Sequence, residues 1–262
     1  MLSECDFGLS FRPIGYTRVS IPPVSSVCSG LLFSFINIQK ICISPVRYKK
    51  QKNLLLTTAL YSYIRKMNFL AHIYLSGDDE LLRIGNFIAD SIKGNKYTMF
   101  PKRVQQGILL HRQIDSYTDH HPTVRQSTRR LHANYSHYSG VIVDMYYDHF
   151  LAANWGDYSD VPLDVFADEF YTTLENHRDI LPERTLGMLP YMKRENWLLS
   201  YASLEGLERI LTQMNRRTAY KSNMHLAVHD LRAHYTAFQE EFTVFFKELL
   251  IFTRAKIREA DQ

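Results

Sequence analysis

Ionisable side chains occupy predicted helix faces that are otherwise apolar, at spacings that bring them together. His111 and Asp115 are four residues apart, and so are Asn86 and Asp90. Residues four apart lie on one face of an α-helix. An isolated carboxylate buried on such a face is costly and would take up a proton instead. We therefore expect these groups to meet a positive charge in the folded protein.

A third predicted helix, over residues 138–155, repeats this pattern. Asp144 and Asp148 are four residues apart, His149 follows, and the helix is apolar nearly all round, so we expect it to be buried. His72 follows a short apolar run. Metal sites in helical bundles are assembled from inward-facing side chains of this kind. The sequence therefore predicts that these helices share a cation. The candidate ligands are Asp90, His111, Asp115, Asp148 and His149, which His72 could join, and Asn86, Asp119 and Asp144 are possible substitutes for weaker members of this set.

Each of these pairs also has a simpler interpretation. A lone histidine on an apolar face is usually a hydrogen-bonded core residue, and Asn86 with Asp90 could cap a neighbouring helix. His120 and His121 before Pro122 are typical of a loop or a helix N-terminus. A non-catalytic helical binding protein would pair the carboxylates with Arg or Lys. The metal hypothesis instead requires at least three candidates to lie within a few ångströms of a common point.

Cysteine, histidine and charge all divide the chain near residue 66. The three cysteines precede this point and the eleven histidines follow it, so thiolate ligands are excluded from the later part. Residues 1–66 have a net charge of +7 and residues 67–262 of −3, which together give the overall +4. The basic balance is therefore no sign of nucleic-acid binding by the later part. No apolar run reaches the roughly 18 residues that a membrane span needs. Together, these features favour a cytoplasmic hydrolase.

Residues 1–66 differ from the rest of the chain in pattern as well. Prolines interrupt them, acids are nearly absent, and residues 49–52 are basic. This composition fits a targeting peptide, or an over-long N-terminus with Met67 as the true start. We favour the second interpretation because dense, consistent patterning begins at Met67. We thus expect a poorly structured extension over 1–66 and a single domain over 67–262.

Helix signals dominate after residue 66, and no alternating strand pattern of useful length appears. Pro101, Pro122 and Pro162 mark helix starts. Large apolar residues repeat at spacings of four and three over residues 224–249, which predicts one long helix packed across the core. The fold class is therefore all-α, a single bundle-like domain. The other predicted helices span residues 81–93, 101–118, 122–134, 138–155, 162–176 and 203–216, and Pro182 precedes a further short helix.

Several blocks of residues 67–250 resemble the acyl carrier protein phosphodiesterase family, in order and at the expected spacings. These blocks are Met67–His72, Gly85–Asp90, Gly94-Asn95, Gly107–Arg112, Ile114-Asp115, Thr118–Pro122, Asp144–Leu151, Asn196–Leu198, Gly206-Leu207, Met214–Arg217 and Ala233–Tyr235. This family is similar to the HD group of metal-dependent phosphohydrolases, which are all-helical and use His/Asp clusters. Gln113 departs from the pattern, because a second basic residue is expected after Arg112. The departure would weaken docking of an acidic partner.

The resemblance implies a hydrolase that removes the 4′-phosphopantetheine arm from holo acyl carrier protein and leaves the serine hydroxyl of the apo carrier. The implied cofactor is a divalent cation, Mn²⁺ or else Mg²⁺, which would activate water and polarise the phosphoryl oxygen. Arg112 would brace the phosphate through its guanidinium. Asp119 or His121 would protonate the leaving serine oxygen.

The substrate prediction has an alternative, in which the same metal phosphohydrolase acts on a nucleotide or another small phosphodiester. An acidic carrier protein should need exposed basic residues near the site, whereas a small substrate should not. We expect such residues among the following arginines: Arg103, Arg112, Arg125, Arg129 and Arg130. If these side chains scatter to different faces, the carrier hypothesis weakens.

Overall fold

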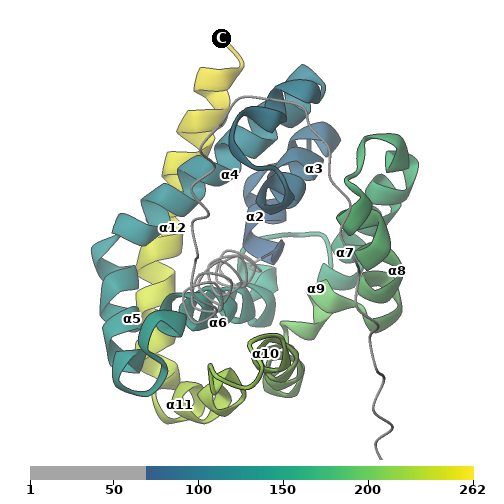
Figure 1. Cartoon of the computed structure of the whole chain (residues 1–262). Coiled ribbons are helices and arrows are strands. Elements are labelled where there is room, and N and C mark those ends of the chain that lie inside the picture. The colour runs from purple at the N-terminus through teal and green to yellow at the C-terminus, as the bar shows by residue number, and fades with distance from the viewer. Residues whose placement is uncertain (1–68) are drawn as a thin grey trace, which may run out of the picture. The chain divides into compact units, whose positions relative to one another are not determined.

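The computed structural model describes residues 69–262, which form α-helices joined by short turns, with no strand among them (Figure 1). The predicted all-α class is confirmed. The extension expected over 1–66 and the start expected at Met67 lie outside the described residues and stay predictions. The helices are α2 (Phe69–Leu75), α3 (Glu80–Ile88), α4 (Lys102–His120), α5 (Pro122–Tyr135), α6 (Ser139–Ala153), α7 (Leu163–Asn176), α8 (Glu183–Glu195), α9 (Trp197–Ser200), α10 (Leu204–Arg217), α11 (Ala227–Ala233) and α12 (Tyr235–Ala260).

Helix α6 lies at the centre of the core, as its composition predicts. Residues such as Ile142, Met145 and Phe150 are fully buried. Helix α12 lies along α4, where Tyr117 stacks on Phe252 with ring centroids 4.4 Å apart. None of the described helices is long and apolar enough to cross a membrane.

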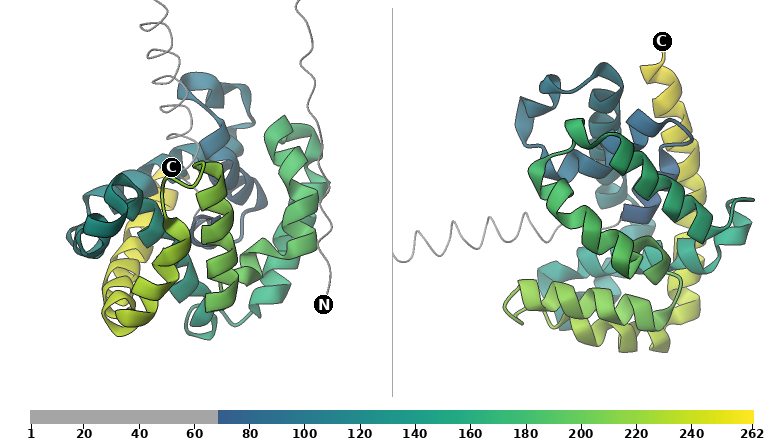
Figure 2. Two further views of the ribbon diagram at one scale, coloured as in Figure 1. Left: turned by 60° about the horizontal axis from the view of Figure 1, so that its bottom comes forward. Right: turned by 90° about the vertical axis from the view of Figure 1, so that its right-hand side faces the viewer.

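The prediction of one continuous helix over residues 224–249 is wrong. A 3-10 turn (Met224–Leu226) leads into α11, and the chain breaks at His234 before α12 begins. Both helices bury their stripe of apolar residues. Helix α11 packs against α10 at one end of the described helices, whereas α12 extends from there along α5 and α4 (Figure 2). The apolar residues of this stripe therefore pack in two different directions. One straight helix could not make both sets of contacts.

The helix predicted over residues 81–93 also ends early. Helix α3 stops at Ile88, and a tighter 3-10 turn, η1 (Ala89–Ser91), carries Asp90. A second 3-10 segment, η2 (Gly94–Met99), then leads to α4. A 3-10 turn advances by 3.0 residues per turn instead of 3.6, so η1 changes the direction of Asp90 relative to the apolar face of α3.

Helices α3 and α4 approach so closely that only glycine fits at their contact. A Cβ atom on Gly85 would lie 2.2 Å from the carbonyl oxygen of Val104 and 2.9 Å from the Cα of Gly107. A Cβ atom on Gly107 would lie 2.3 Å from the carbonyl oxygen of Leu82. This close approach therefore requires glycine at both positions. It brings the C-terminal part of α3 against the middle of α4.

We predict that Gly85→Ala lowers the free energy of unfolding, because the new methyl group overlaps backbone atoms that cannot rotate away. Overpacking of this kind costs about 1–3 kcal/mol. Gly187→Ala in α8 is the matched control, since a Cβ atom there meets nothing within 4 Å. It should raise stability by about 0.5–1 kcal/mol through helix propensity. Urea unfolding of both variants checks the pair, and equal effects would contradict the close contact.

Candidate metal centre

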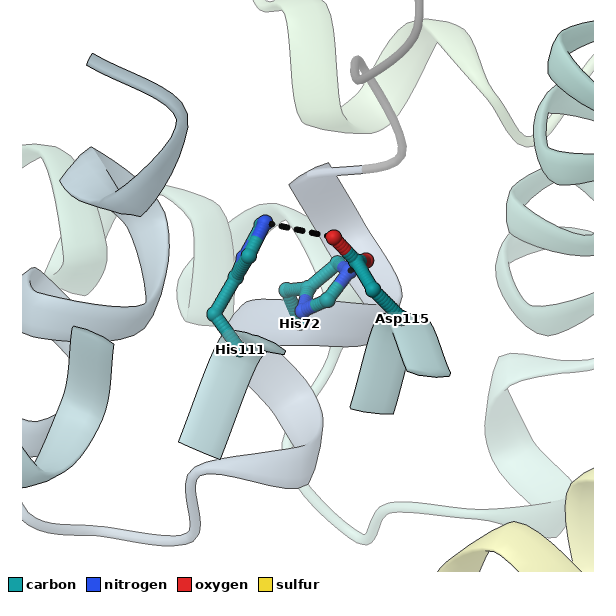
Figure 3. Close-up of side chains that lie close together, drawn as sticks. All are labelled: His72, His111 and Asp115. Atoms are coloured by element: carbon teal, nitrogen blue, oxygen red, sulfur yellow. Dashed lines mark ion pairs between the residues drawn. The ribbon is translucent and has the colours of Figure 1, made fainter. Parts of the chain in front are cut away.

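Three segments bring four of the six predicted ligands together. His72 comes from α2, Asp90 from η1, and His111 and Asp115 from α4. His72, His111 and Asp115 each offer one ligand atom, and these three atoms all lie within 4.8 Å of one another (Figure 3). The Asp115 carboxylate lies 3.4 Å from Nε2 of His72 and 3.3 Å from Nε2 of His111. Oδ1 of Asp90 lies 3.3 Å from the same His111 nitrogen.

The fully buried amide of Asn86 fixes which nitrogen of each histidine carries a proton. Its Nδ2 donates to the carbonyl oxygen of His72 and to Oγ of Ser76, both at 2.9 Å, so its oxygen faces the two rings. That oxygen accepts from Nδ1 of His72 at 2.8 Å and from Nδ1 of His111 at 3.1 Å. A neutral histidine that donates through Nδ1 presents a lone pair at Nε2, so a cation binds there in place of any proton. Both Nε2 atoms are therefore set up as ligands on the side that faces the carboxylates.

This donor set fits a divalent cation. The Nε2 atoms of His72 and His111 are buried and have no hydrogen-bond partner among the described residues. Each faces a carboxylate oxygen of Asp115 at 3.3–3.4 Å. A nitrogen lone pair and a carboxylate oxygen repel each other unless a positive charge lies between them. Imidazole nitrogen with carboxylate oxygen is a common ligand combination for borderline metals. The arrangement is compatible with a His-His-Asp metal site.

The pKa values within the cluster show how strongly its members interact. Burial lowers the pKa of His111, but the Asp115 and Asp90 carboxylates, each 3.3 Å from its Nε2, outweigh burial and raise it to about 9. Burial and the neighbouring His111 lower the pKa of His72. Burial opposes ionisation of Asp115, yet the two histidines hold its pKa well below the usual range. The stacked rings, 4.1 Å apart, thus favour one positive charge in the cluster over two.

Asp148 and His149 are not among the residues that could hold a metal together, and their polar atoms bind other groups. The Asp148 carboxylate accepts from the backbone N–H groups of Leu70 at 3.1 Å and Ala71 at 2.9 Å, and so caps the first turn of α2. Burial raises the pKa of Asp148 to about 7, although these two N–H groups favour the ionised form. His149 donates through Nδ1 to the carbonyl oxygen of Tyr201 at 2.7 Å, and its Nε2 accepts from the Tyr235 hydroxyl at 3.1 Å.

Arg112 follows His111 on α4 but points toward the segment between α3 and α4. Its Nη2 donates to the carbonyl oxygens of Ile92 at 3.2 Å and Gly94 at 2.8 Å. Its guanidinium lies over the ring of Tyr97, 5.2 Å from the centroid. In this structure Arg112 therefore holds residues 92–97 against α4 beside the cluster.

The two predicted proton donors lie at the end of α4. Asp119 is exposed, one helical turn beyond Asp115. His121 is buried, and its Nδ1 accepts from the backbone N–H of Thr123 at 3.3 Å, which caps α5. Nε2 of His121 donates to the Glu248 carboxylate at 3.2 Å. Of the two, only Asp119 presents its side chain to solvent.

Four of the five arginines expected to dock a carrier protein bind other groups of the protein, including Arg125, which donates to the backbone carbonyl oxygen of Asp119 at 3.4 Å. Arg103 pairs with Asp79 and Asp261, and Arg112 donates to the carbonyl oxygens described above. Arg130 forms two hydrogen bonds, of 2.8 and 2.6 Å, with the buried carboxylate of Glu241. Arg125 and Arg129 are exposed on α5. Of these five arginines, Arg125 and Arg129 therefore remain exposed to a partner.

Sequence reasoning noticed Asn86 as a partner of Asp90 but missed its role between the histidines, and it missed Ser76 entirely. Ser76 donates to the carbonyl oxygen of His72 at 2.9 Å and accepts from Asn86, which completes the network around the amide. One signal was available, because an asparagine in an apolar helix face directly after a close-contact glycine needs buried partners. The identity of those partners depends on how α2 and α4 pack against α3.

We predict that Asp148→Asn lowers the free energy of unfolding by about 1–3 kcal/mol, the cost of a buried donor left unsatisfied. The new NH₂ group would face one of the two backbone N–H groups at the start of α2, donor against donor. The exposed Asp160→Asn substitution is the control and should change stability by about 0.5 kcal/mol or less. Urea unfolding at neutral pH measures both. A harmless Asp148→Asn would contradict the capping role.

Comparison with known proteins agrees with these features. Residues 67–249 match the sequence model of a family described as acyl carrier protein phosphodiesterase. A protein named acyl carrier protein phosphodiesterase from Photorhabdus laumondii is 32% identical over 185 residues, which cover 70% of this chain and 93% of the relative. One of the same name from Shigella boydii is 31% identical over 187 residues, or 70% of this chain and 96% of the relative.

No solved structure matches the chain. The similarity to HD phosphohydrolases therefore stays a prediction. The family match covers the whole span that carries His72, Asp90, His111 and Asp115, and it covers more than half of the chain. The chain belongs to the acyl carrier protein phosphodiesterase family.

Proposed function

We propose that this protein is a metal-dependent phosphodiester hydrolase that removes the 4′-phosphopantetheine arm from holo acyl carrier protein. Its family membership supports the substrate. The observation that carries the chemistry is the pair of buried histidines whose Nε2 lone pairs Asn86 directs toward Asp115. An acyl carrier protein substrate would make this protein a cytoplasmic enzyme of lipid metabolism.

We propose His72, His111, Asp115 and Asp90 as the residues that hold the cation. A bound divalent cation would lower the pKa of a coordinated water and polarise the phosphoryl oxygen. The mixed set of imidazole and carboxylate ligands favours Mn²⁺ over Mg²⁺, because Mg²⁺ prefers an all-oxygen environment.

The remaining predicted residues have other roles in this proposal. Asp148 and His149 position α2 and α6 instead of binding metal, because their polar atoms already have protein partners. Arg112 positions the segment beside the site. Asp119, exposed and one turn beyond Asp115, donates a proton to the leaving serine oxygen. We prefer it to His121, whose two nitrogens bind Thr123 and Glu248.

The proposed reaction is tested by mass spectrometry of holo acyl carrier protein incubated with this protein and Mn²⁺. We expect the carrier to lose the mass of its arm, with apo carrier and free 4′-phosphopantetheine as products. A chelator should stop the reaction, and added Mn²⁺ should restore it. His111→Ala and Asp115→Asn should lower the rate at least about a hundredfold, since each removes a ligand.

An unchanged carrier mass would contradict the proposal. Turnover of a nucleotide or another small phosphodiester by the same preparation would then favour the alternative substrate class. Metal binding without any turnover would favour a non-catalytic protein.

We further predict that Asn86→Ala weakens Mn²⁺ binding about 10- to 100-fold, the usual cost of removing an outer partner of a ligating histidine. Without the amide oxygen, neither Nδ1 has its acceptor, and both rings can rotate or change tautomer. Isothermal titration calorimetry measures the affinity. Asn176→Ala, at an exposed asparagine on α7, is the control and should bind Mn²⁺ as the parent does. Equal affinities in both variants would argue against the role of Asn86.

A further inference from the structure

The chain between the metal-site residues Asp90 and Asp115 is basic throughout. It contains five Lys or Arg residues and no Asp or Glu. Most of it forms η2 and the first half of α4, which contact each other, and α4 also contacts η1, the turn that carries Asp90. This stretch therefore carries an uninterrupted positive charge next to the proposed active site.

Three of the five basic side chains are exposed. Lys93, Lys96 and Lys102 face solvent. The ion pairs that lysines form among the described residues involve Lys193 and Lys256 instead. Met99 lies between them in the sequence and is 83% exposed. We call Lys93, Lys96, Met99 and Lys102 the basic surface.

Contacts of Arg112 fix the start of the basic surface beside the metal site. Its hydrogen bonds to the carbonyl oxygens of Ile92 and Gly94 lie on either side of Lys93, and its guanidinium covers Tyr97 next to Lys96. Farther along, Gln105 donates to the carbonyl oxygen of Phe100 at 2.8 Å. The lysines are thus presented from a segment that is tied to α4 at both ends.

The basic surface is too long to serve a small substrate. Lys102 and His111 are separated by nine residues of α4, about 14 Å along the helix at 1.5 Å per residue. Lys102 is therefore out of reach of a small phosphodiester bound at the cluster. Protein partners, by contrast, cover roughly 800 Å² on each side. An exposed methionine flanked by lysines resembles the centre and rim of such an interface.

We infer that the basic surface docks the acidic face of the carrier protein whose arm is cleaved. This inference rests on the proposed function and specifies how that substrate is recognised. The lysines pair with carboxylates of the carrier while Met99 makes the apolar contact. The serine that bears the arm then lies toward Lys93, beside the metal site. Charge complementarity of this kind raises the association rate and weakens as salt increases.

The test compares two substrates in the presence of Mn²⁺: holo acyl carrier protein and bis(4-nitrophenyl) phosphate, a small phosphodiester without a protein part. For Lys93→Glu/Lys96→Glu, we expect kcat/KM on the carrier to fall at least about tenfold, mostly through KM, and to depend less on salt. Hydrolysis of the small phosphodiester should stay within about twofold of the parent, because the metal site is intact.

The matched control is Arg216→Glu/Lys221→Glu, which makes the same change in charge. Both positions are exposed: Arg216 lies in the last turn of α10, and Lys221 follows this helix. It should leave both activities within about twofold of the parent. An equal loss in the control would mean that net charge matters and not this surface. An equal loss on both substrates would place the lysines in the chemistry, and no loss would place docking elsewhere. Each of these results overturns the inference.

Failure of the proposed function gives a different result. In that case the parent protein itself would leave holo carrier intact, while the inference alone fails when the parent is active and the lysine variant cleaves the carrier equally well. Circular dichroism of the variants excludes unfolding as the cause, because both lysines are exposed and their replacement should leave the helix content unchanged.

Discussion

The geometry of the candidate site depends on the amide of Asn86. Its oxygen accepts from His72 on α2 and from His111 on α4. Its nitrogen donates to the backbone carbonyl oxygen of His72. Because a buried amide must satisfy both of its ends, the positions of α2, α3 and α4 are coupled. The tautomers of His72 and His111 follow from the same constraint, so both rings are set up before any ligand binds.

Two features of the fold make this bridge possible. Glycines at positions 85 and 107 let α3 and α4 approach within backbone contact, which places Asn86 within reach of His111. Helix α2 has only seven residues, too few for much stability by itself. Asp148 from the buried helix α6 compensates by accepting its first N–H groups. The polar site is thus supported by a close helix contact on one side and a capped helix start on the other.

The sequence determined the elements and half of the site. Proline and serine signals and the 3.6-residue periodicity are local, so the class and most helix starts could be predicted, including those at Pro101, Pro122 and Ser203. The pair His111 and Asp115 could also be predicted, because a spacing of four within one helix fixes their relative position. Local pattern failed at His234, where the same apolar stripe continues although the chain turns.

The tertiary structure decided which buried polar groups meet. Asp90, Asp115 and Asp148 look equivalent in the sequence, each on an apolar helix face. Packing directs the first two toward a pair of histidines and the third toward the backbone of α2. It also turns Arg112 away from the cluster to hold the neighbouring segment. Spacing along one helix fixes a face, but the group opposite that face belongs to another helix, and only the packing of the helices determines which one it is.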